Sequence, residues 1–352
     1  MSDGKTTLSI GLYHHFQKIE KKVGFIKPVG QRYVMLDDVQ IDKDSYLIDN
    51  IYSPDTDIRL TSPIAIPSGY TEEYILHREE RKHVLQEKLT NSFNHLADGK
   101  DIMILEGTGH AGVGSVLDLS NAYVAKLLGA KVILIAPGGI GNTIDEVMLN
   151  KALFDQIGVE VLGVVVNKVF EDKYEKVRSL LTKAFQNYNI PVLGFIPYRY
   201  DLSSPNMALI KESLKAEILN EGENPFQNIK DIVVGAMTPH YVLSYLKKGS
   251  LLITPGDRED LLLAALSLAL LSSENRLAGI LLTGGILPRE NVANLLKKSN
   301  IPVYHVLHDT YETAKKVSNL NVKITINDKK KIETAKTLID EYVDKDYILE
   351  HI

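Results

Sequence analysis

Short apolar segments rich in Val and Ile alternate with longer amphipathic segments over the first two-thirds of the chain. This alternation is typical of parallel strands joined by crossover helices, because strands that are covered on both faces are apolar throughout. The predicted strands are 23–29, 102–106, 131–136, 161–167 and 191–197. The predicted helices are 6–22, 71–96, 119–128, 143–157 and 173–187. The pattern therefore predicts an α/β domain with a doubly wound, mostly parallel sheet.

The alternation loosens after residue 198, at a turn-rich stretch around Ser204 and a polar stretch at 220–224, and then resumes in smaller units. The predicted strands of this second part are 231–235, 251–254, 278–283 and 303–307, and its predicted helices are 258–271, 290–298 and 310–318. A chain of 352 residues is long enough to bury two separate cores. We therefore expect one domain at 1–204 and a smaller α/β domain at 205–352.

Composition excludes several classes of protein. Apolar residues make up 44% of the chain and charged residues 24%, as in an ordinary globular protein. A formal charge of -5 argues against binding to nucleic acid, which usually requires a basic surface. The chain has no cysteine, which excludes disulfides, thiolate metal sites and cysteine nucleophiles. Neither a signal peptide nor an apolar run long enough to cross a membrane is evident. We expect a cytoplasmic protein with no membrane partner.

The clearest chemical motif is Gly4-Lys5-Thr6-Thr7 at the start of the first predicted helix. It matches the second half of a Walker A loop, in which the helix N-terminus and a lysine hold phosphate and a threonine binds Mg²⁺. Two interpretations remain open: the strand and first glycine of the motif lie upstream of this sequence, or the loop has decayed and Lys5 is a surface residue. We favour the first, because omitting a central strand leaves two neighbours with unpaired edges.

Other predicted strand ends carry groups that a nucleotide site requires, and in a parallel sheet those ends lie at one edge. Lys27 places an ammonium group there, although it could be a solvated lysine. Asp44 and Glu106 are hard oxygen donors suited to Mg²⁺, and Glu106 ends a buried strand. Asp44 could instead cap a helix or stabilise a turn.

Two further strand ends fit a nucleotide. Gly107 follows the carboxylate at position 106 and allows a ligand to approach the backbone closely. Asn167 ends the strand 161–167, where its amide could recognise a base edge. The residue two positions after Lys168 is Phe170 rather than Asp, so the guanine-specific pattern is absent and adenine is favoured.

A series of motifs extends this pattern through residue 200, in the order Gly4-Lys5-Thr6-Thr7, Lys27-Pro28-Val29, Asp44-Ser45, Thr61-Ser62-Pro63, Glu106-Gly107-Thr108-Gly109 and Gly194-Phe195-Ile196-Pro197. Together they resemble dethiobiotin synthetase and its relatives among the ATP-dependent carboxylases and amide synthases. The resemblance implies a P-loop fold with ATP and Mg²⁺ as ligands.

From the resemblance, Lys5 and Thr6 are expected to bind phosphate and Mg²⁺, while Asp44 and Glu106 complete the metal site. Lys27 is the expected catalytic residue, facing the γ-phosphate and an acceptor.

The flanking Gly4, Thr7 and Gly107 are expected to contribute to the same nucleotide site. Asn167 and Pro197 are expected to frame the adenine.

In the second domain, Asp257-Arg258 and Thr283-Gly284-Gly285 lie at the ends of adjacent predicted strands. They could form a pocket for an anion or a nucleotide, or merely a structural ion pair and a tight turn. These motifs, with Asp309-Thr310-Tyr311-Glu312-Thr313, resemble the DRTGG domain. The two domains in this order look like the N-terminal region of long bacterial phosphotransacetylases, where they are implied to regulate a C-terminal acyltransferase domain.

Three functions are compatible with this sequence. The favoured one is a regulatory or sensor protein that binds ATP and Mg²⁺ in the first domain and a small-molecule effector or a protein partner in the second. The alternative is an ATP-dependent ligase that activates a carboxylate or carbamate. A nucleotide-free scaffold is the third. The sequence ends before any acyltransferase domain, so we expect no acetyltransferase activity. A homo-oligomer is expected because homo-oligomers are common.

Overall fold

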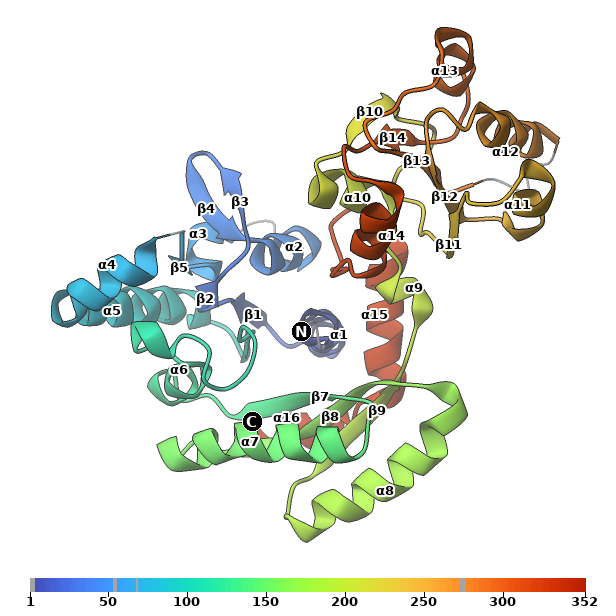
Figure 1. Cartoon of the computed structure of the whole chain (residues 1–352). Helices are drawn as coiled ribbons and strands as arrows, with labels where there is room; N and C mark the ends of the chain where they lie inside the picture. Colours follow the sequence, from blue (N-terminus) through green and yellow to red (C-terminus); the bar gives the residue numbers. More distant parts are fainter. Residues whose placement is uncertain (1–3, 53–55, 68, 272–276) are drawn as a thin grey trace. The chain divides into compact units, whose positions relative to one another are not determined.

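The computed structural model describes residues 4–52, 56–67, 69–271 and 277–352 (Figure 1). The chain forms two compact units: unit 1 contains Met1–Arg199 and Ile324–Ile352, and unit 2 contains Tyr200–Lys323. Each unit is an α/β structure with parallel strands, as the hydrophobic pattern predicts.

The main strands of unit 1 form two parallel sheets. One sheet pairs β1 (Val23–Ile26) with β6 (Ile102–Leu105), and the other has the order β7 (Val132–Pro137), β8 (Val161–Val169) and β9 (Val192–Pro197). The most buried of these strands is β8, whose central valines are inaccessible to solvent. The shorter strands are β2 (Val29–Gly30), parallel to β5 (Ile64–Ala65), and β3 (Tyr33–Leu36), which forms an antiparallel hairpin with β4 (Val39–Asp42).

Helices cover both sheets of unit 1. They are α1 (Lys5–Lys18), α2 (Lys43–Tyr52), α3 (Ile58–Thr61), α4 (Tyr70–Leu76), α5 (Arg78–Ala97), α6 (Asn121–Leu127), α7 (Gly141–Ile157), α8 (Tyr174–Asn187), α15 (Lys329–Tyr342) and α16 (Lys345–His351), with 3₁₀ turns η1 (Ser115–Leu117) and η2 (Glu171–Lys173). The helix predicted at 71–96 is divided at His77 into α4 and α5. The pattern did not predict the hairpin or α2, because both are too short to show a clear period.

The C-terminal segment differs from the sequence expectation, which placed everything after residue 205 in the second domain. Residues 324–352 contact unit 1 instead. Helix α15 packs along α1, and their backbones approach closely at Gly11, where a Cβ atom would lie 2.2 Å from the Ile339 side chain. The next residues extend the β9 sheet, since the Asp344 N–H donates to the Leu193 carbonyl at 2.7 Å. Sequence pattern cannot assign such a helix to a distant core.

Unit 2 contains one five-stranded sheet. The order is β10 (Glu217–Asn220), β14 (Val303–His305), β13 (Gly279–Thr283), β12 (Ser250–Pro255) and β11 (Asp231–Val234), with β10 antiparallel to β14 and the other pairs parallel. Successive residues of a strand point to opposite faces. Accordingly, Leu252 packs in one apolar cluster, and Leu251 and Ile253 pack in another. The helices are α9 (Tyr200–Ser203), α10 (Met207–Leu214), α11 (Pro239–Tyr245), α12 (Glu259–Leu271), α13 (Glu290–Lys297) and α14 (Thr310–Ser318).

Among the helices of the described residues, none has the length and apolar character needed to span a membrane.

The contact between α1 and α15 gives a stability prediction. Gly11→Ala should lower the free energy of unfolding by about 1–3 kcal/mol, because its methyl group overlaps Ile339 in a packed interface. The matched control is Gly141→Ala in α7, where a Cβ atom has no neighbour within 4 Å and the change should be neutral or stabilising. Urea unfolding measures both.

A double-mutant cycle with Ile339→Ala checks the cause of that loss. The double variant should lose less stability than the sum of the two single losses, because the smaller side chain leaves room for the methyl group. Additive losses would contradict the proposed contact.

Candidate functional site

A buried ion cluster lies at the carboxyl ends of β1 and β6. Lys27 follows β1 and Glu106 follows β6, and the parallel pairing of Ile26 with Leu105 places these two residues side by side. The Lys27 Nζ lies 2.9 Å from Glu106 Oε1 and 2.9 Å from Asp44 Oδ2. Asp44 belongs to the first turn of α2. The three side chains are at most 5% exposed. The structure therefore brings together three of the predicted site residues.

Local hydrogen bonds fix this cluster. The Lys27 N–H donates to the Thr61 carbonyl at 2.8 Å, and the Glu106 N–H donates to the Ile26 carbonyl at 3.0 Å. The Asp44 N–H donates to Asp42 Oδ1 at 2.9 Å, which positions the start of α2. Asp42 is thus a positioning residue that the sequence pattern did not indicate.

The charges of the cluster are strongly coupled. Burial acts to lower the pKa of Lys27, but the carboxylates of Glu106 and Asp44 outweigh it and the net pKa is raised. Burial raises the pKa of Glu106, opposed by the Lys27 ammonium and reinforced by Asp44. The second oxygen of that carboxylate, Glu106 Oε2, is buried and has no hydrogen-bond partner in the described part of the chain. Buried polar atoms are nearly always paired, so this oxygen is a candidate ligand-binding atom.

The start of α1 reaches the same carboxylate. Thr6 Oγ1 donates to Glu106 Oε1 at 3.0 Å, and the Lys5 side chain lines cavities next to Glu106 and Gly107. The N-cap residue of α1 is Gly4, which has no side chain to cap the first amides of the helix. The N-terminus of a helix carries partial positive charge and favours anions. Lys5, Thr6 and Glu106 therefore converge on one edge of the sheets.

The backbone conformation and the neighbours of position 4 require a glycine there. Its φ angle is 99°, in the left-handed region, and a Cβ atom would lie 2.0 Å from Asn167 Nδ2. Asn167 is buried at the end of β8, and its Oδ1 accepts the Lys168 N–H at 2.8 Å. Pro197 ends the neighbouring strand β9 and pairs with Val169. The predicted adenine residues thus lie near the ends of adjacent strands, with Asn167 beside the start of α1, and their role remains a prediction.

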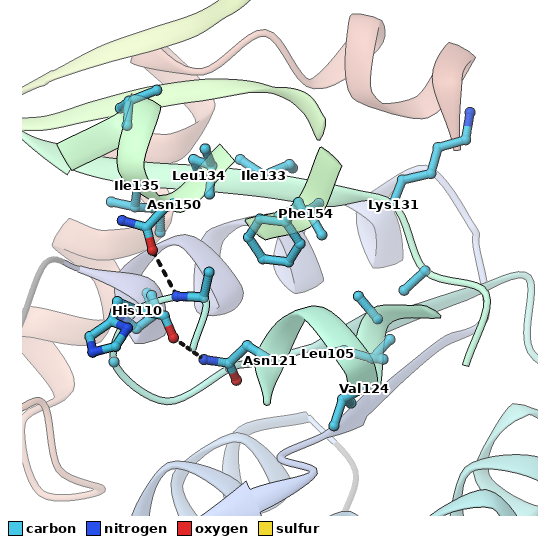
Figure 2. Close-up of a pocket in the computed structure, with 18 of the residues that line it drawn as sticks. Leu105, His110, Asn121, Val124, Lys131, Ile133, Leu134, Ile135, Asn150 and Phe154 are labelled. Atoms are coloured by element: carbon cyan, nitrogen blue, oxygen red, sulfur yellow. Dashed lines mark hydrogen bonds between the residues drawn. The ribbon is translucent and has the colours of Figure 1, made fainter. Parts of the chain in front are cut away.

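The loop after Glu106 is fixed by two asparagines (Figure 2). Asn121 Nδ2 donates to the carbonyls of Thr108 and His110, both at 2.7 Å, and Asn150 Oδ1 accepts the Ala111 N–H at 2.7 Å. A Cβ atom on Gly107 would lie 2.8 Å from Asn121 Oδ1. Nothing in the sequence marked the two asparagines, since each lies on a helix some distance along the chain.

The oxygen donors fit Mg²⁺ in part. Thr6 and Glu106 are adjacent and supply two hard oxygens, one of them unpaired. Asp44 and Glu106 both accept a hydrogen bond from the Lys27 ammonium. The described residues contain no group of three or more His, Asp or Glu that could hold a metal by itself. Mg²⁺ usually keeps several waters and takes only one or two carboxylates from the protein, so Thr6 and Glu106 are the residues that could hold it beside phosphate.

In unit 2, the predicted ligand residues lie at two adjacent strand ends, since Pro255 of β12 pairs with Thr283 of β13. Asp257 is exposed after β12, whereas Arg258 binds its own unit: its guanidinium donates to the carbonyls of Gly235 at 3.1 Å and Met237 at 3.0 Å. Arg258 therefore holds the loop after β11 to the start of α12.

The other half of that edge is a left-handed turn. The φ angles are 73° at Gly284 and 66° at Gly285, and both residues are exposed. Thr283 is buried, with its hydroxyl 2.7 Å from that of Thr310. Thr254 Oγ1, at the end of β12, is buried and lacks a partner within the described ranges. This edge thus carries an exposed backbone turn, and its binding of a ligand remains a prediction.

Comparison with known families gives two matches. The family described as AAA domain matches residues 2–206, and the DRTGG domain matches residues 209–320. The first covers the segment that contains the buried ion cluster and the start of α1. The second lies within unit 2, which contains Tyr200–Lys323.

Curated relatives match almost the whole chain. A phosphate acetyltransferase of Nitrosomonas europaea is 28% identical over 98% of this chain and 50% of its own length, and one of Pseudomonas putida is 28% identical over 97% and 49%. The chain spans about half the length of the curated relatives it matches. The two domains and these relatives together fit the N-terminal region of long phosphotransacetylases.

Among solved structures, the CBS and DRTGG domains of the regulatory region of Clostridium perfringens pyrophosphatase, complexed with the activator diadenosine tetraphosphate, cover 40% of this chain and 67% of their own. The sequence identity is 19% and the TM-score 0.29, which is too low to compare the two structures residue by residue.

Removal of the Lys27 ammonium from the buried cluster should destabilise the protein to an extent that depends on pH. Lys27→Met should lower the free energy of unfolding by about 3–5 kcal/mol at neutral pH, because it removes the ammonium that compensates the buried carboxylates of Asp44 and Glu106. Without the ammonium, the folded-state pKa of Glu106 rises further above its unfolded value. The variant therefore regains stability as the pH falls through that pKa.

Urea unfolding at pH 7 and pH 5 measures this difference. Lys100→Met, at an exposed lysine, is the matched control and should change stability little at either pH. Equal losses of unfolding free energy in the two variants would contradict the assignment of Lys27 as the cation that compensates the buried carboxylates. A loss in Lys27→Met that does not depend on pH would contradict it as well.

Proposed function

We propose that this chain is a regulatory protein whose unit 1 binds ATP together with Mg²⁺. The chain belongs to the AAA domain family over residues 2–206 and carries a DRTGG domain over residues 209–320. The observation that carries the proposal is the contact between Thr6 at the start of α1 and the buried carboxylate of Glu106.

This contact supports a site for phosphate and Mg²⁺. The amides of the first turn of α1, beginning at Lys5, offer partial positive charge, and the Lys5 ammonium adds a full charge. Thr6 and Glu106 supply the hard oxygens that Mg²⁺ prefers. When bound, Mg²⁺ neutralises phosphate charge that the buried carboxylates would otherwise repel.

Close approach and base binding are proposed for the surrounding residues. Gly4 and Gly107 both lie where a larger side chain would collide with an asparagine, so glycine at these positions keeps the start of α1 and the loop after β6 in place. Thr7 belongs to the same first turn of α1. Asn167 and Pro197, at the ends of β8 and β9, are proposed to bind the adenine.

Regulation fits the site better than group transfer. The Lys27 ammonium is bound by two carboxylates at 2.9 Å each and is buried, so its charge is already neutralised. An enzyme that used Lys27 to stabilise an acceptor would first have to break both ion pairs. A protein that only binds nucleotide needs no such step, and the cluster instead fixes β1, β6 and α2 around the site.

Unit 2 is proposed to bind a small-molecule effector at the edge formed by Thr283, Gly284 and Gly285. The exposed left-handed turn and the unpaired Thr254 hydroxyl support this role. By analogy with the relatives named phosphate acetyltransferase, the two units are proposed to couple nucleotide and effector levels to an acyltransferase activity.

Removal of the Lys5 side chain should weaken ATP binding. Lys5→Ala is expected to raise the Kd for ATP with Mg²⁺ at least tenfold, or about 1.4 kcal/mol, because it deletes the ammonium next to the start of α1. Lys18→Ala, at the other end of the same helix, should leave the Kd unchanged. Isothermal titration on the full chain tests both, and equal affinities in all three proteins would exclude the proposed phosphate site.

The metal requirement gives an independent prediction. Chelation of Mg²⁺ should weaken ATP binding to the wild-type chain at least tenfold, since the uncompensated phosphates then face Glu106. In Glu106→Gln, which keeps the side-chain shape but removes the charge, chelation should change the Kd by less than about threefold. Titrations with and without EDTA measure this, and an equal effect in the two proteins would remove Glu106 from the metal site.

A further inference from the structure

Unit 2 contains a cavity at the end of its sheet opposite to Thr283. The volume of this cavity is about 590 Å³, within the size range of pockets that hold small molecules. It lies at the amino ends of β13 and β14, because Leu277 precedes β13 and both Ile301 and Pro302 precede β14. Thr283, by contrast, is the last residue of β13. The cavity is therefore separate from the edge at which an effector is proposed to bind.

Apolar side chains form the floor and two walls of the cavity. Leu266, Leu277 and Ile301 are buried members of the apolar cluster beneath α12 and α13. Leu263 of α12 and Leu295 of α13 line the cavity as well and are 41% and 51% exposed. Figure 1 shows the two helices beside the same sheet. An apolar surface that enters the cavity would remove these leucines from water, which is favourable.

Hydrogen bonds between two loops fix the polar side of the cavity. Asn220 Nδ2 donates to the carbonyls of Ser299 and Ile301, both at 2.8 Å. The Glu223 N–H donates to the Asn300 carbonyl at 3.0 Å. The loop after β10 is thus bound to the loop between α13 and β14, and both loops line the cavity. The cavity is therefore already formed before a ligand binds.

Three side-chain amides line the cavity beside the leucines, at Asn224, Gln227 and Asn300. The Oδ1 atom of Asn224 accepts the Phe226 N–H at 3.2 Å. Within the described ranges, neither its NH₂ group nor the side chains of Gln227 and Asn300 make a hydrogen bond. A side-chain amide offers both donors and an acceptor. These groups therefore fit a ligand whose edge also carries both donors and acceptors.

The cavity is not built for an anion. Among the described residues that line it, Glu223 is the one acid and Lys298 the one base, so their formal charges cancel. None of these residues belongs to the first turn of a helix, whereas α13 ends at the cavity with Lys298 as its C-cap. The C-terminal end of a helix carries partial negative charge. A neutral ligand therefore fits this cavity better than a phosphate or a carboxylate.

We propose that this cavity binds an uncharged nucleoside. A nucleobase has faces that pack against apolar side chains and an edge that carries hydrogen-bond donors and acceptors. The faces pack against Leu263 and Leu295, and the edge forms hydrogen bonds with the amides of Gln227 and Asn300. The lack of a phosphate distinguishes this ligand from the nucleotide proposed for unit 1. The site goes beyond the effector edge of unit 2 and does not depend on it.

Hydrogen exchange of the full chain tests the site with adenosine, guanosine, cytidine and uridine, each added separately. At least one of them should slow the exchange of residues 223–227 and 299–301. The expected factor is about ten when the nucleoside is present at ten times its Kd, because the bound state must release the ligand before these loops open.

Two variants test the contacts by isothermal titration. Leu263→Glu places a carboxylate beside the base, and Asn300→Leu removes one amide at nearly constant size. Each should raise the Kd of the nucleoside at least about tenfold. Leu149→Glu, at a leucine of α7 that is 76% exposed, is the matched control and should leave the Kd unchanged. All three positions are exposed, so the thermal midpoint should change little.

The 5′-monophosphate of the nucleoside that binds gives a test of charge. Its Kd, measured by exchange of the same two segments, should be at least about tenfold higher than that of the nucleoside. Equal or tighter binding would overturn the assignment of an uncharged ligand.

Three other results would overturn the proposed site. The first is that none of the four nucleosides slows exchange in the two loops. The second is protection confined to 283–286, since the ligand then binds at the opposite end of the sheet. The third is an unchanged Kd in Asn300→Leu and in Leu263→Glu. ATP titration of unit 1 is independent of all three, so the nucleotide proposal and this one can fail separately.

Discussion

The site in unit 1 depends on a buried ammonium group held between two carboxylates. Lys27, Asp44 and Glu106 come from three separate elements, and each charge would be costly to bury alone. Their pairing therefore ties the end of β1, the end of β6 and the first turn of α2 to one position. Because Thr6 donates to the same Glu106 carboxylate, the start of α1 is tied to that position as well. The cluster therefore holds four chain segments together at one edge of the sheets.

Much of this edge could be predicted from the sequence because parallel strands end together. Lys27, Glu106 and Asn167 each follow an apolar segment, and the rule that such ends meet was enough to group them. Asp42 and Asn121 could not be found in this way. They act on the backbone through hydrogen bonds, and no residue pattern distinguishes a helix asparagine that binds a loop from one that faces solvent.

The fold was predictable to a similar extent and for similar reasons. Strands that are apolar throughout, such as β8, have an unambiguous pattern, and the two α/β units follow from their order. The position of α15 was not predictable, since its apolar stripe shows only that one face is buried and not which core receives it. Its contact with Gly11 of α1 is made across most of the chain. Likewise, β6 and β7 have complete apolar patterns, and only the pairing shows that, within the described residues, each is bonded to a strand on one side.

The ion cluster and the start of α1 are physically linked to β6. Glu106 directly follows β6, so any movement of that strand moves the carboxylate that binds Lys27 and Thr6. A strand paired on one side, with half-buried apolar residues, opens locally at lower free energy than one paired on both sides. A ligand that binds Thr6 and Glu106 therefore holds the end of β6 and lowers its local opening. The ion cluster is the contact that couples the start of α1 to β6, because the same Glu106 carboxylate binds both Thr6 and Lys27.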